Sequence, residues 1–236
     1  MRPSEACQHT VEQLQARAAS RGRRCVVTID GPAASGKSSV ARGIAQKLAI
    51  PYVSSGLLYR AATYLVCQQG TDVADDEAIV TMLESQPVLL EARGQAANRV
   101  WLQETDLTPQ LHTEEIDHYV SAVARHARVR RWVDERLRQL AGPFVIEGRD
   151  MGTAVFPDAA FKFYLSATPE VRAARRVGER GAGLAEITQA LKRRDELDAK
   201  QLVPAPDAQH IDTTRLAIEQ VMAQVLVGLE VCEHPA

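Results

Sequence analysis

The sequence predicts an α/β protein in which a parallel β-sheet is flanked by helices, with a second, smaller unit inserted into it. Three observations lead to this prediction. Short apolar runs alternate with stretches of helical periodicity, which indicates parallel strands joined by right-handed crossovers. A glycine-rich loop follows the first apolar run and leads directly into a helix. A β-rich stretch then interrupts the alternation, and it predicts the inserted unit.

The predicted elements can be placed along the chain by apolar periodicity and by turn residues. The strands of the sheet are expected at 24–29, 52–53, 144–148, 162–167 and 209–214, and its helices at 39–49, 57–68, from 169 onward and at 215–230. The insert is expected to contain a helix at 75–84, hairpin strands at 88–91 and 99–103 around the turn G-Q-A-A-N, and one long helix at 113–140.

Composition narrows the class of protein. The chain has 236 residues, of which 45% are hydrophobic and 25% charged, a typical balance for a globular domain. Its net charge of −2 provides no general basic field, so we expect no nucleic-acid partner. The apolar runs fall short of the ~20 residues that span a bilayer, and the N-terminus has no apolar signal segment, so we expect no membrane partner.

The four cysteines form no C-x-x-C pair, which favours free thiols in a reducing, cytoplasmic location. The polar residues 1–22 are expected to be a flexible extension outside the fold, and residues 23–236 to form the domain. Nothing in the sequence indicates an oligomer, and we expect a monomer.

The loop after the first strand carries the most specific motif. Residues 31–38 read G-P-A-A-S-G-K-S and match G-x-x-x-x-G-K-[ST], the phosphate-binding P-loop. Small residues allow successive backbone N–H groups to point inward, and the following helix adds its positive end. Lys37 is expected to reach the β- and γ-phosphates of a bound nucleotide as a point charge, and the Ser38 hydroxyl to ligate Mg²⁺. The alternative, an ordinary glycine-rich turn with a solvated lysine, does not explain the full pattern.

Two further segments place charged residues after predicted strands, where ligands gather in a parallel sheet. The first is S-S-G-L-L-Y-R, which ends in Tyr59 and Arg60. The second is I-E-G-R-D-M-G-T, with Arg149 and Asp150. The alternatives are a solvated helix face for Arg60 and a structural Arg149–Asp150 ion pair.

An arginine-rich tract follows the fourth strand. Its glycines, Gly178, Gly181 and Gly183, predict a mobile hairpin of helices, and such a cationic flap could close over phosphates and exclude water. A solvated basic helix is the alternative. The tract contains Arg172, Arg175, Arg176, Arg180, Arg193 and Arg194, followed by Asp195 and Asp198.

Several of these segments, in order, resemble the bacterial cytidylate kinases, a family of nucleoside monophosphate (NMP) kinases. The segments are GPAASGKSS, SSGLLYRAA, EGRDMGTAVFPDA, KFYLSA and HIDTT, and the resemblance runs from about Cys25 to Val221. It implies a P-loop NTPase-type sheet, an inserted NMP-binding subdomain at about 70–141 and a small Arg-rich lid at about 175–200. The implied reaction transfers the γ-phosphoryl group of ATP to CMP and dCMP, with Mg²⁺ as cofactor.

The resemblance also implies site residues. The ATP phosphates would be held by Gly31, Pro32, Ala33, Ala34, Ser35, Gly36, Lys37, Ser38 and Ser39. The acceptor nucleotide would be held by Ser55, Tyr59, Arg60, Ser121, Arg130, Arg149, Asp150, Arg194 and Asp198, with Ser121 and Arg130 at the cytosine. Transition-state charge would be neutralised by Lys37, Arg149, Arg175, Arg176 and Arg194. Mg²⁺ would be held by Ser38, with Glu147 acting through a water molecule.

The chain departs from the family pattern at several positions. Ser54 and Glu147 stand where the family usually has aspartate, and His112 stands where it has arginine. The lid is shorter, and Lys200 is the nearest substitute for a second lid-side arginine. Three alternatives therefore stay open: another small-molecule P-loop kinase that accepts UMP, AMP or shikimate, a nucleotide-dependent switch, which would need a guanine-recognition motif such as N-K-x-D, and a non-catalytic nucleotide-binding module.

Overall fold

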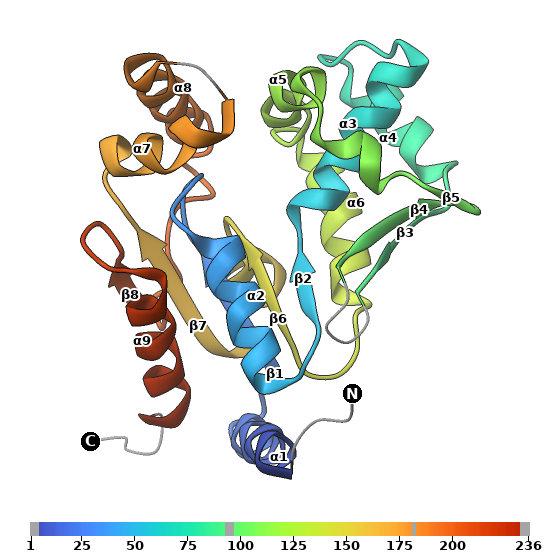
Figure 1. The fold of residues 1–236 in the computed structure, drawn as a ribbon. Helices are drawn as coiled ribbons and strands as arrows, with labels where there is room; N and C mark the ends of the chain where they lie inside the picture. The colour runs from blue at the N-terminus through green and yellow to red at the C-terminus, as the bar shows by residue number, and fades with distance from the viewer. Residues whose placement is uncertain (1–4, 93–96, 181–182, 232–236) are drawn as a thin grey trace. The chain divides into compact units, whose positions relative to one another are not determined.

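The computed structural model describes residues 5–92, 97–180 and 183–231 (Figure 1). The chain divides into two compact units, of which the first combines Met1–Val53 with Gly142–Ala236 and the second is Ser54–Ala141. The predicted insert, 70–141, falls within the second unit, which begins earlier, at Ser54.

The first unit contains the predicted sheet of five strands, in the order β2-β6-β1-β7-β8, and the pairs β6–β1, β1–β7 and β7–β8 are parallel. The α/β prediction is therefore confirmed. The strands are β1 (Arg24–Asp30), β2 (Tyr52–Ser54), β6 (Phe144–Gly148), β7 (Ala159–Ser166) and β8 (Gln209–Asp212). The helices are α1 (Glu5–Ser20), α2 (Lys37–Leu48), α7 (Pro169–Arg180), α8 (Leu184–Leu197) and α9 (Ile218–Val231), with a short π-helical turn at Met151–Val155.

One face of the sheet carries the main hydrophobic core. Ile29 of β1 and Leu165 of β7 are fully buried there, together with Ile44 of α2 and Val225 of α9. Phe144 of β6 lies outside this cluster and packs edge to face against Phe156, with ring centroids 5.5 Å apart. Because β1, β6 and β7 are buried along most of their length, they read as largely apolar runs in the sequence, as parallel strands do.

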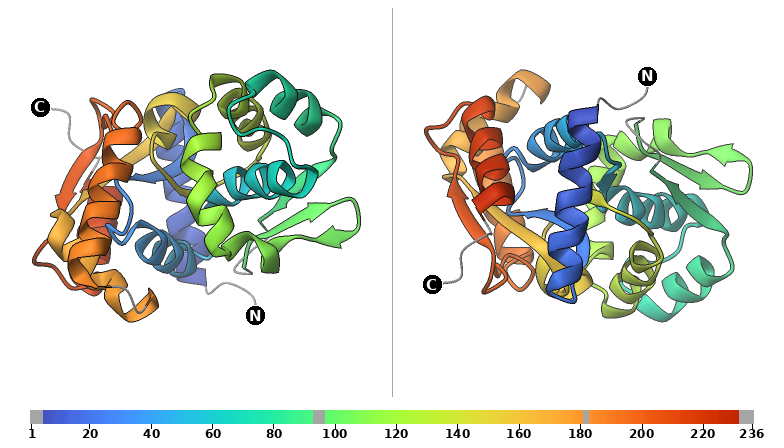
Figure 2. Two further views of the ribbon diagram at one scale, coloured as in Figure 1. Left: turned by 90° about the horizontal axis from the view of Figure 1, so that it is seen from above. Right: turned by 90° about the horizontal axis from the view of Figure 1, so that it is seen from below.

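The N-terminal segment is the clearest departure from expectation. Residues 1–22 were expected to be flexible and outside the fold, but α1 packs on the first unit, as Figures 1 and 2 show. Leu14 and Ala18 are buried in the main core, and the Arg17 guanidinium lies 5.7 Å from the Phe161 ring and donates to the Leu229 carbonyl. Leu14 and Ala18 lie one helical turn apart, and most of the residues around them are polar. This is why the sequence of the segment did not indicate that it packs against the core.

The second unit combines helices with a three-stranded antiparallel sheet, in the order β3-β4-β5. The hairpin strands were predicted, whereas the short third strand and a 3-10 helix, Thr108–His112, were not. Residues 94–96 of the predicted G-Q-A-A-N turn lie outside the described residues. The elements are α3 (Gly56–Gln69), α4 (Asp76–Glu84), β3 (Val88–Glu91), β4 (Arg99–Leu102), β5 (Thr105–Asp106), α5 (Glu114–Val123) and α6 (Ala127–Arg138).

The predicted long helix at 113–140 is wrong, because the structure divides it into α5 and α6. His126 adopts an extended backbone conformation before α6, and its Nε2 lies 2.7 Å from the Val73 carbonyl oxygen. This bond joins the break to a segment more than fifty residues away, so no local sequence signal marks it.

The predicted lid at 175–200 corresponds to the end of α7, the whole of α8 and the turn after it. The two helices pack against each other, as a helical hairpin requires. Gly181 lies outside the described residues, and the predicted mobility of the hairpin remains a prediction.

The burial of α1 can be tested with Leu14→Ala. We expect this change to lower the free energy of unfolding by about 2–3 kcal/mol, because it removes a buried side chain from the core. Gln15→Ala, on the exposed face of the same helix, is the matched control and should leave stability nearly unchanged. Thermal and urea denaturation measure the difference, and equal stability of the two variants would mean that α1 does not pack as described.

Candidate active site

The phosphate loop connects β1 to α2 through a tightly curled backbone. Gly31, Ala34 and Gly36 all have positive φ angles, of 144°, 59° and 94°. A Cβ atom at Gly31 would lie 2.0 Å from the Leu165 carbonyl oxygen, so only glycine fits between this loop and β7. Three positive φ angles in six residues turn the chain back on itself, which is the geometry of an anion-binding nest.

Lys37 begins α2 and is buried at the base of this loop. Its Nζ donates to the Pro32 carbonyl oxygen at 2.6 Å, so without a ligand the ammonium group binds the loop itself. Burial and the positive charge of Arg149 lower the pKa of Lys37 to about 7. An incoming polyphosphate would supply the negative charge that this site lacks.

Polar side chains in and near the loop could contact a nucleotide and its metal. Ser35 Oγ is buried and has no hydrogen-bond partner in the part of the chain that the structure describes. Ser38 and Ser39 are exposed. Across the described ranges no three acidic, histidine or cysteine side chains cluster as a metal site. Glu147 is buried near the end of β6, paired in register with Ile29 of β1.

Asp30 is a site residue that the sequence did not reveal. It ends β1, and its two carboxylate oxygens accept from the backbone N–H groups of Met151 (2.8 Å) and Gly152 (2.7 Å). A Cβ atom at Gly152 would lie 2.8 Å from Thr28 Oγ1, so the glycine allows this close approach. Burial raises the pKa of Asp30 to about 7, although both hydrogen bonds favour the ionised form. Asp30 thus fixes the R-D-M-G segment beside the phosphate loop.

Three of the predicted site residues come together in the first unit. Arg149 Nη2 pairs with Asp198 Oδ2 at 2.9 Å, and Arg149 Nη1 donates to the Gly31 carbonyl oxygen at 3.4 Å. Arg194 Nε lies 3.8 Å from the same Asp198 oxygen. The Arg149 guanidinium therefore links the segment after β6 both to the phosphate loop and to Asp198 at the end of α8. Asp150, also predicted, is buried and begins the π-helical turn.

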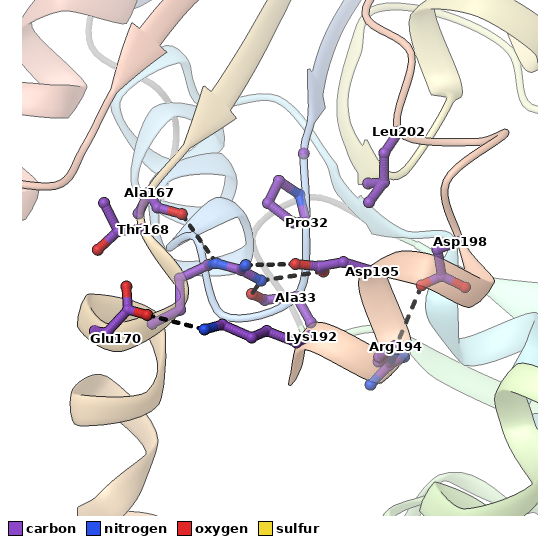
Figure 3. Close-up of polar contacts among 12 residues, drawn as sticks. Pro32, Ala33, Ala167, Thr168, Glu170, Lys192, Arg194, Asp195, Asp198 and Leu202 are labelled. Atoms are coloured by element: carbon purple, nitrogen blue, oxygen red, sulfur yellow. Dashed lines mark hydrogen bonds and ion pairs between the residues drawn. The ribbon is translucent and has the colours of Figure 1, made fainter. Parts of the chain in front are cut away.

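Arg172 joins the phosphate loop to both lid helices. It is 2% exposed, and its guanidinium donates to the carbonyls of Ala33 (3.1 Å) and Ala167 (3.0 Å) and forms a two-pronged ion pair with Asp195. Figure 3 shows Ala33, Ala167 and Asp195 around one guanidinium, and Arg194 of α8 beside Asp198, which follows the end of that helix. A small apolar cluster lies at this contact and contains Ala33, Ala173, Ile187 and Leu191.

Arg175, which is predicted to neutralise phosphate charge, binds a residue of the protein in this structure. Its guanidinium donates to the hydroxyl (3.1 Å) and the carbonyl (2.6 Å) of Thr213, just after β8. Thr213 Oγ1 in turn lies 3.2 Å from the Ser35 carbonyl oxygen. Arg175 therefore supports the phosphate loop through Thr213. Direct neutralisation of phosphate charge by Arg175 and the half-buried Arg176 remains a prediction.

The second unit holds the other predicted residues. Ser55 and Tyr59 are buried at the start of α3, and the Arg130 guanidinium lies 5.7 Å from the Tyr59 ring. Ser121 is half-buried on α5. Arg60 Nη2 pairs with Asp117 Oδ1 at 2.6 Å, which the sequence did not predict.

The position of Ser54, where the chain departs from the family pattern, is fixed by a second residue that sequence reasoning missed. The Ser54 backbone N–H donates to Asn98 Oδ1 at 2.7 Å, and Asn98 is 6% exposed. Asn98 was predicted only as part of a turn, because its partner is more than forty residues away.

Comparisons with known proteins agree with this arrangement. The family model described as cytidylate kinase matches residues 27–230. The chain is 55% identical over 206 residues to the cytidylate kinase of Thermus thermophilus, covering 87% of this chain and 99% of that one. It is 55% identical over 201 residues to the cytidylate kinase of Deinococcus radiodurans (85% and 97% covered), and 36% identical over 215 residues to that of Bacillus licheniformis (86% and 95% covered).

The match extends over most of the chain and includes both the phosphate loop and the R-D-M-G segment. These findings show that the protein belongs to the cytidylate kinase family.

Proposed function

We propose that the protein transfers the γ-phosphoryl group of ATP to the 5′-phosphate of CMP, giving CDP and ADP, and that dCMP is a second acceptor. The observation that carries this proposal is the phosphate loop, with its curled backbone and buried Lys37, in a chain whose relatives are named cytidylate kinases. The intact loop favours a catalytic protein over a non-catalytic nucleotide-binding module.

The chemistry needs positioning and charge more than it needs a base. The acceptor phosphate is already anionic, so no side chain has to remove a proton, and catalysis consists of alignment and neutralisation of charge on the transferred group. Lys37 exchanges the Pro32 carbonyl for phosphate oxygens. Arg149 and Arg194, which share Asp198, would supply further positive charge.

Mg²⁺ is the proposed cofactor, held by Ser38 and, through water, by Glu147. When bound, the ion would screen the donor phosphates and orient them. The proposal rests on the exposed Ser38 hydroxyl at the start of α2 and on the buried carboxylate of Glu147 near the end of β6, the strand that pairs with β1.

The acceptor would be recognised by the residues that the family resemblance implies. Arg60 and Arg149 would bind the CMP phosphate, Ser121 and Arg130 the cytosine, and Asp150 and Asp198 the sugar. Tyr59 supports this role for Arg130, because the ring lies beside the guanidinium and favours one orientation of it.

Location and assembly stay proposals. No helix in the described part of the chain is long and apolar enough to cross a membrane. Cys25 and Cys67 are free thiols, as expected for a reducing compartment. We propose a monomer that acts in the cytoplasm.

An acceptor panel tests the proposed reaction. With ATP-Mg²⁺ and CMP, dCMP, UMP, AMP or shikimate, we expect ADP release to be fastest with CMP. Lys37→Met should reduce turnover by about 10³-fold or more, because it removes the cation at the transferring phosphates. Preference for UMP, AMP or shikimate would replace the proposed acceptor, and ADP release with none of them would favour a non-catalytic nucleotide-binding module.

The lowered pKa of Lys37 predicts that ATP binding takes up a proton. Above pH 7 the free lysine is mostly neutral, and bound polyphosphate favours its charged form, so affinity for ATP should fall by up to about tenfold per pH unit as pH rises above 7. Calorimetry at pH 8 in buffers of different ionisation enthalpy measures the uptake. Asp30 titrates in the same range, so Lys37→Arg, which stays charged, is the control. Unchanged uptake in that variant would assign the proton elsewhere.

Arg60→Ala tests the acceptor-phosphate site. We expect kcat/KM for CMP to fall by about 10²–10³-fold, because a charge-assisted contact to the phosphate is lost, while ATP binding is retained. Arg131→Ala, an exposed arginine on α6, is the matched control for loss of one positive charge. Steady-state kinetics with varied CMP give the result, and equal kinetics in the two variants would remove Arg60 from the site.

A further inference from the structure

Arg60 is anchored by two groups of the second unit. Its Nη1 donates to the Leu111 carbonyl oxygen at 2.8 Å, and its Nη2 pairs with Asp117 Oδ1 at 2.6 Å. The anchors use different nitrogens, so together they fix the plane of the guanidinium as well as its position.

The two anchors are themselves rigidly mounted. Leu111 is fully buried in the 3-10 helix Thr108–His112. Asp117 lies in the first turn of α5, where Thr113 Oγ1 caps the Ile116 N–H and Ile116 is buried. Neither anchor can move without disturbing the core of this unit.

Anchoring leaves donors for a ligand. A guanidinium carries five N–H groups, and the two contacts use two of them, so three remain without a partner among the described residues. The side chain is 18% exposed and Asp117 is 14% exposed. A phosphate can therefore bind the remaining donors without displacing the carboxylate.

Nearby charges favour this pairing. Burial and the positive charge of Arg60 lower the pKa of His112, which disfavours a second positive charge beside Arg60. In the first turn of α5 the other acidic residues are Glu114 and Glu115, and both are exposed. Asp117 is the carboxylate that the guanidinium contacts.

We propose that Asp117 is a positioning residue for the acceptor: it holds Arg60 in the orientation that binds the acceptor phosphate before the nucleotide arrives. This inference rests on the proposed function, because it takes Arg60 as the phosphate-binding residue. Pre-orientation reduces the conformational entropy that binding would otherwise cost. The opposite role, in which Asp117 competes with the phosphate, predicts the opposite change in affinity.

The test compares Asp117→Ala, Asp117→Asn and the control Glu114→Ala, which removes a carboxylate from the same helical turn. We expect Asp117→Ala to raise the KM for CMP by about tenfold, as for loss of one hydrogen bond to a charged group, with kcat and the KM for ATP little changed. Asp117→Asn keeps an acceptor oxygen and should restore most of the affinity. Glu114→Ala should match the wild type.

Calorimetric titration with CMP alone should reproduce the order of affinities, and thermal denaturation should show that all four proteins are folded at the assay temperature. A lower KM for CMP in both Asp117 variants would overturn the proposal in favour of competition. A KM increase shared equally by CMP and ATP would overturn it in favour of a structural role. KM values equal to those of Glu114→Ala would overturn it by showing that Asp117 does not affect acceptor binding.

The wild-type protein separates this inference from the proposed function. If it phosphorylates another nucleoside monophosphate instead of CMP, the proposed acceptor is wrong, and the same ratios of KM measured with that nucleotide still decide the role of Asp117. If it accepts no nucleoside monophosphate, both proposals are wrong.

Discussion

The close approach of the phosphate loop to neighbouring strands is the constraint on which the rest of the first unit depends. Gly31 lies against the Leu165 carbonyl of β7, and Asp30 binds the N–H groups that follow β6. The curled backbone is therefore held from both sides by contacts within the protein. Backbone N–H groups that are already oriented need little reorganisation when an anion binds.

Three arginines, Arg172, Arg149 and Arg60, are each paired with a carboxylate. Asp195 pairs with Arg172, Asp198 with Arg149, and Asp117 with Arg60. Removing one partner of such a pair leaves an uncompensated charge in a partly dry site, which is costly. The pairs also fix long, flexible side chains, so substrate binding has fewer rotamers to restrict. Pairing thus allows the protein to carry the positive charge that phosphate binding requires without destabilising its fold.

Local signals in the sequence predicted the parts of the fold that depend on local chemistry. Apolar runs predicted the strands, and small residues at fixed spacing predicted the phosphate loop. The roles of Asp30 and Asp117 were missed because each depends on a partner distant in sequence, at residues 151–152 and at Arg60. The same limit applies to α1, whose place in the core depends on Leu14 and Ala18 meeting side chains from distant strands and helices.

The break between α5 and α6 has a consequence for base recognition. Ser121 and Arg130 are nine residues apart, and at about 100° per residue a continuous helix would place them roughly 180° apart, on opposite faces. One helix at 113–140 could not direct both side chains to one cytosine. The extended backbone at His126, held by the Val73 carbonyl, separates the two helices and allows Arg130 to lie beside Tyr59 while Ser121 stays on α5. The proposed cytosine site therefore requires the break that the sequence did not predict.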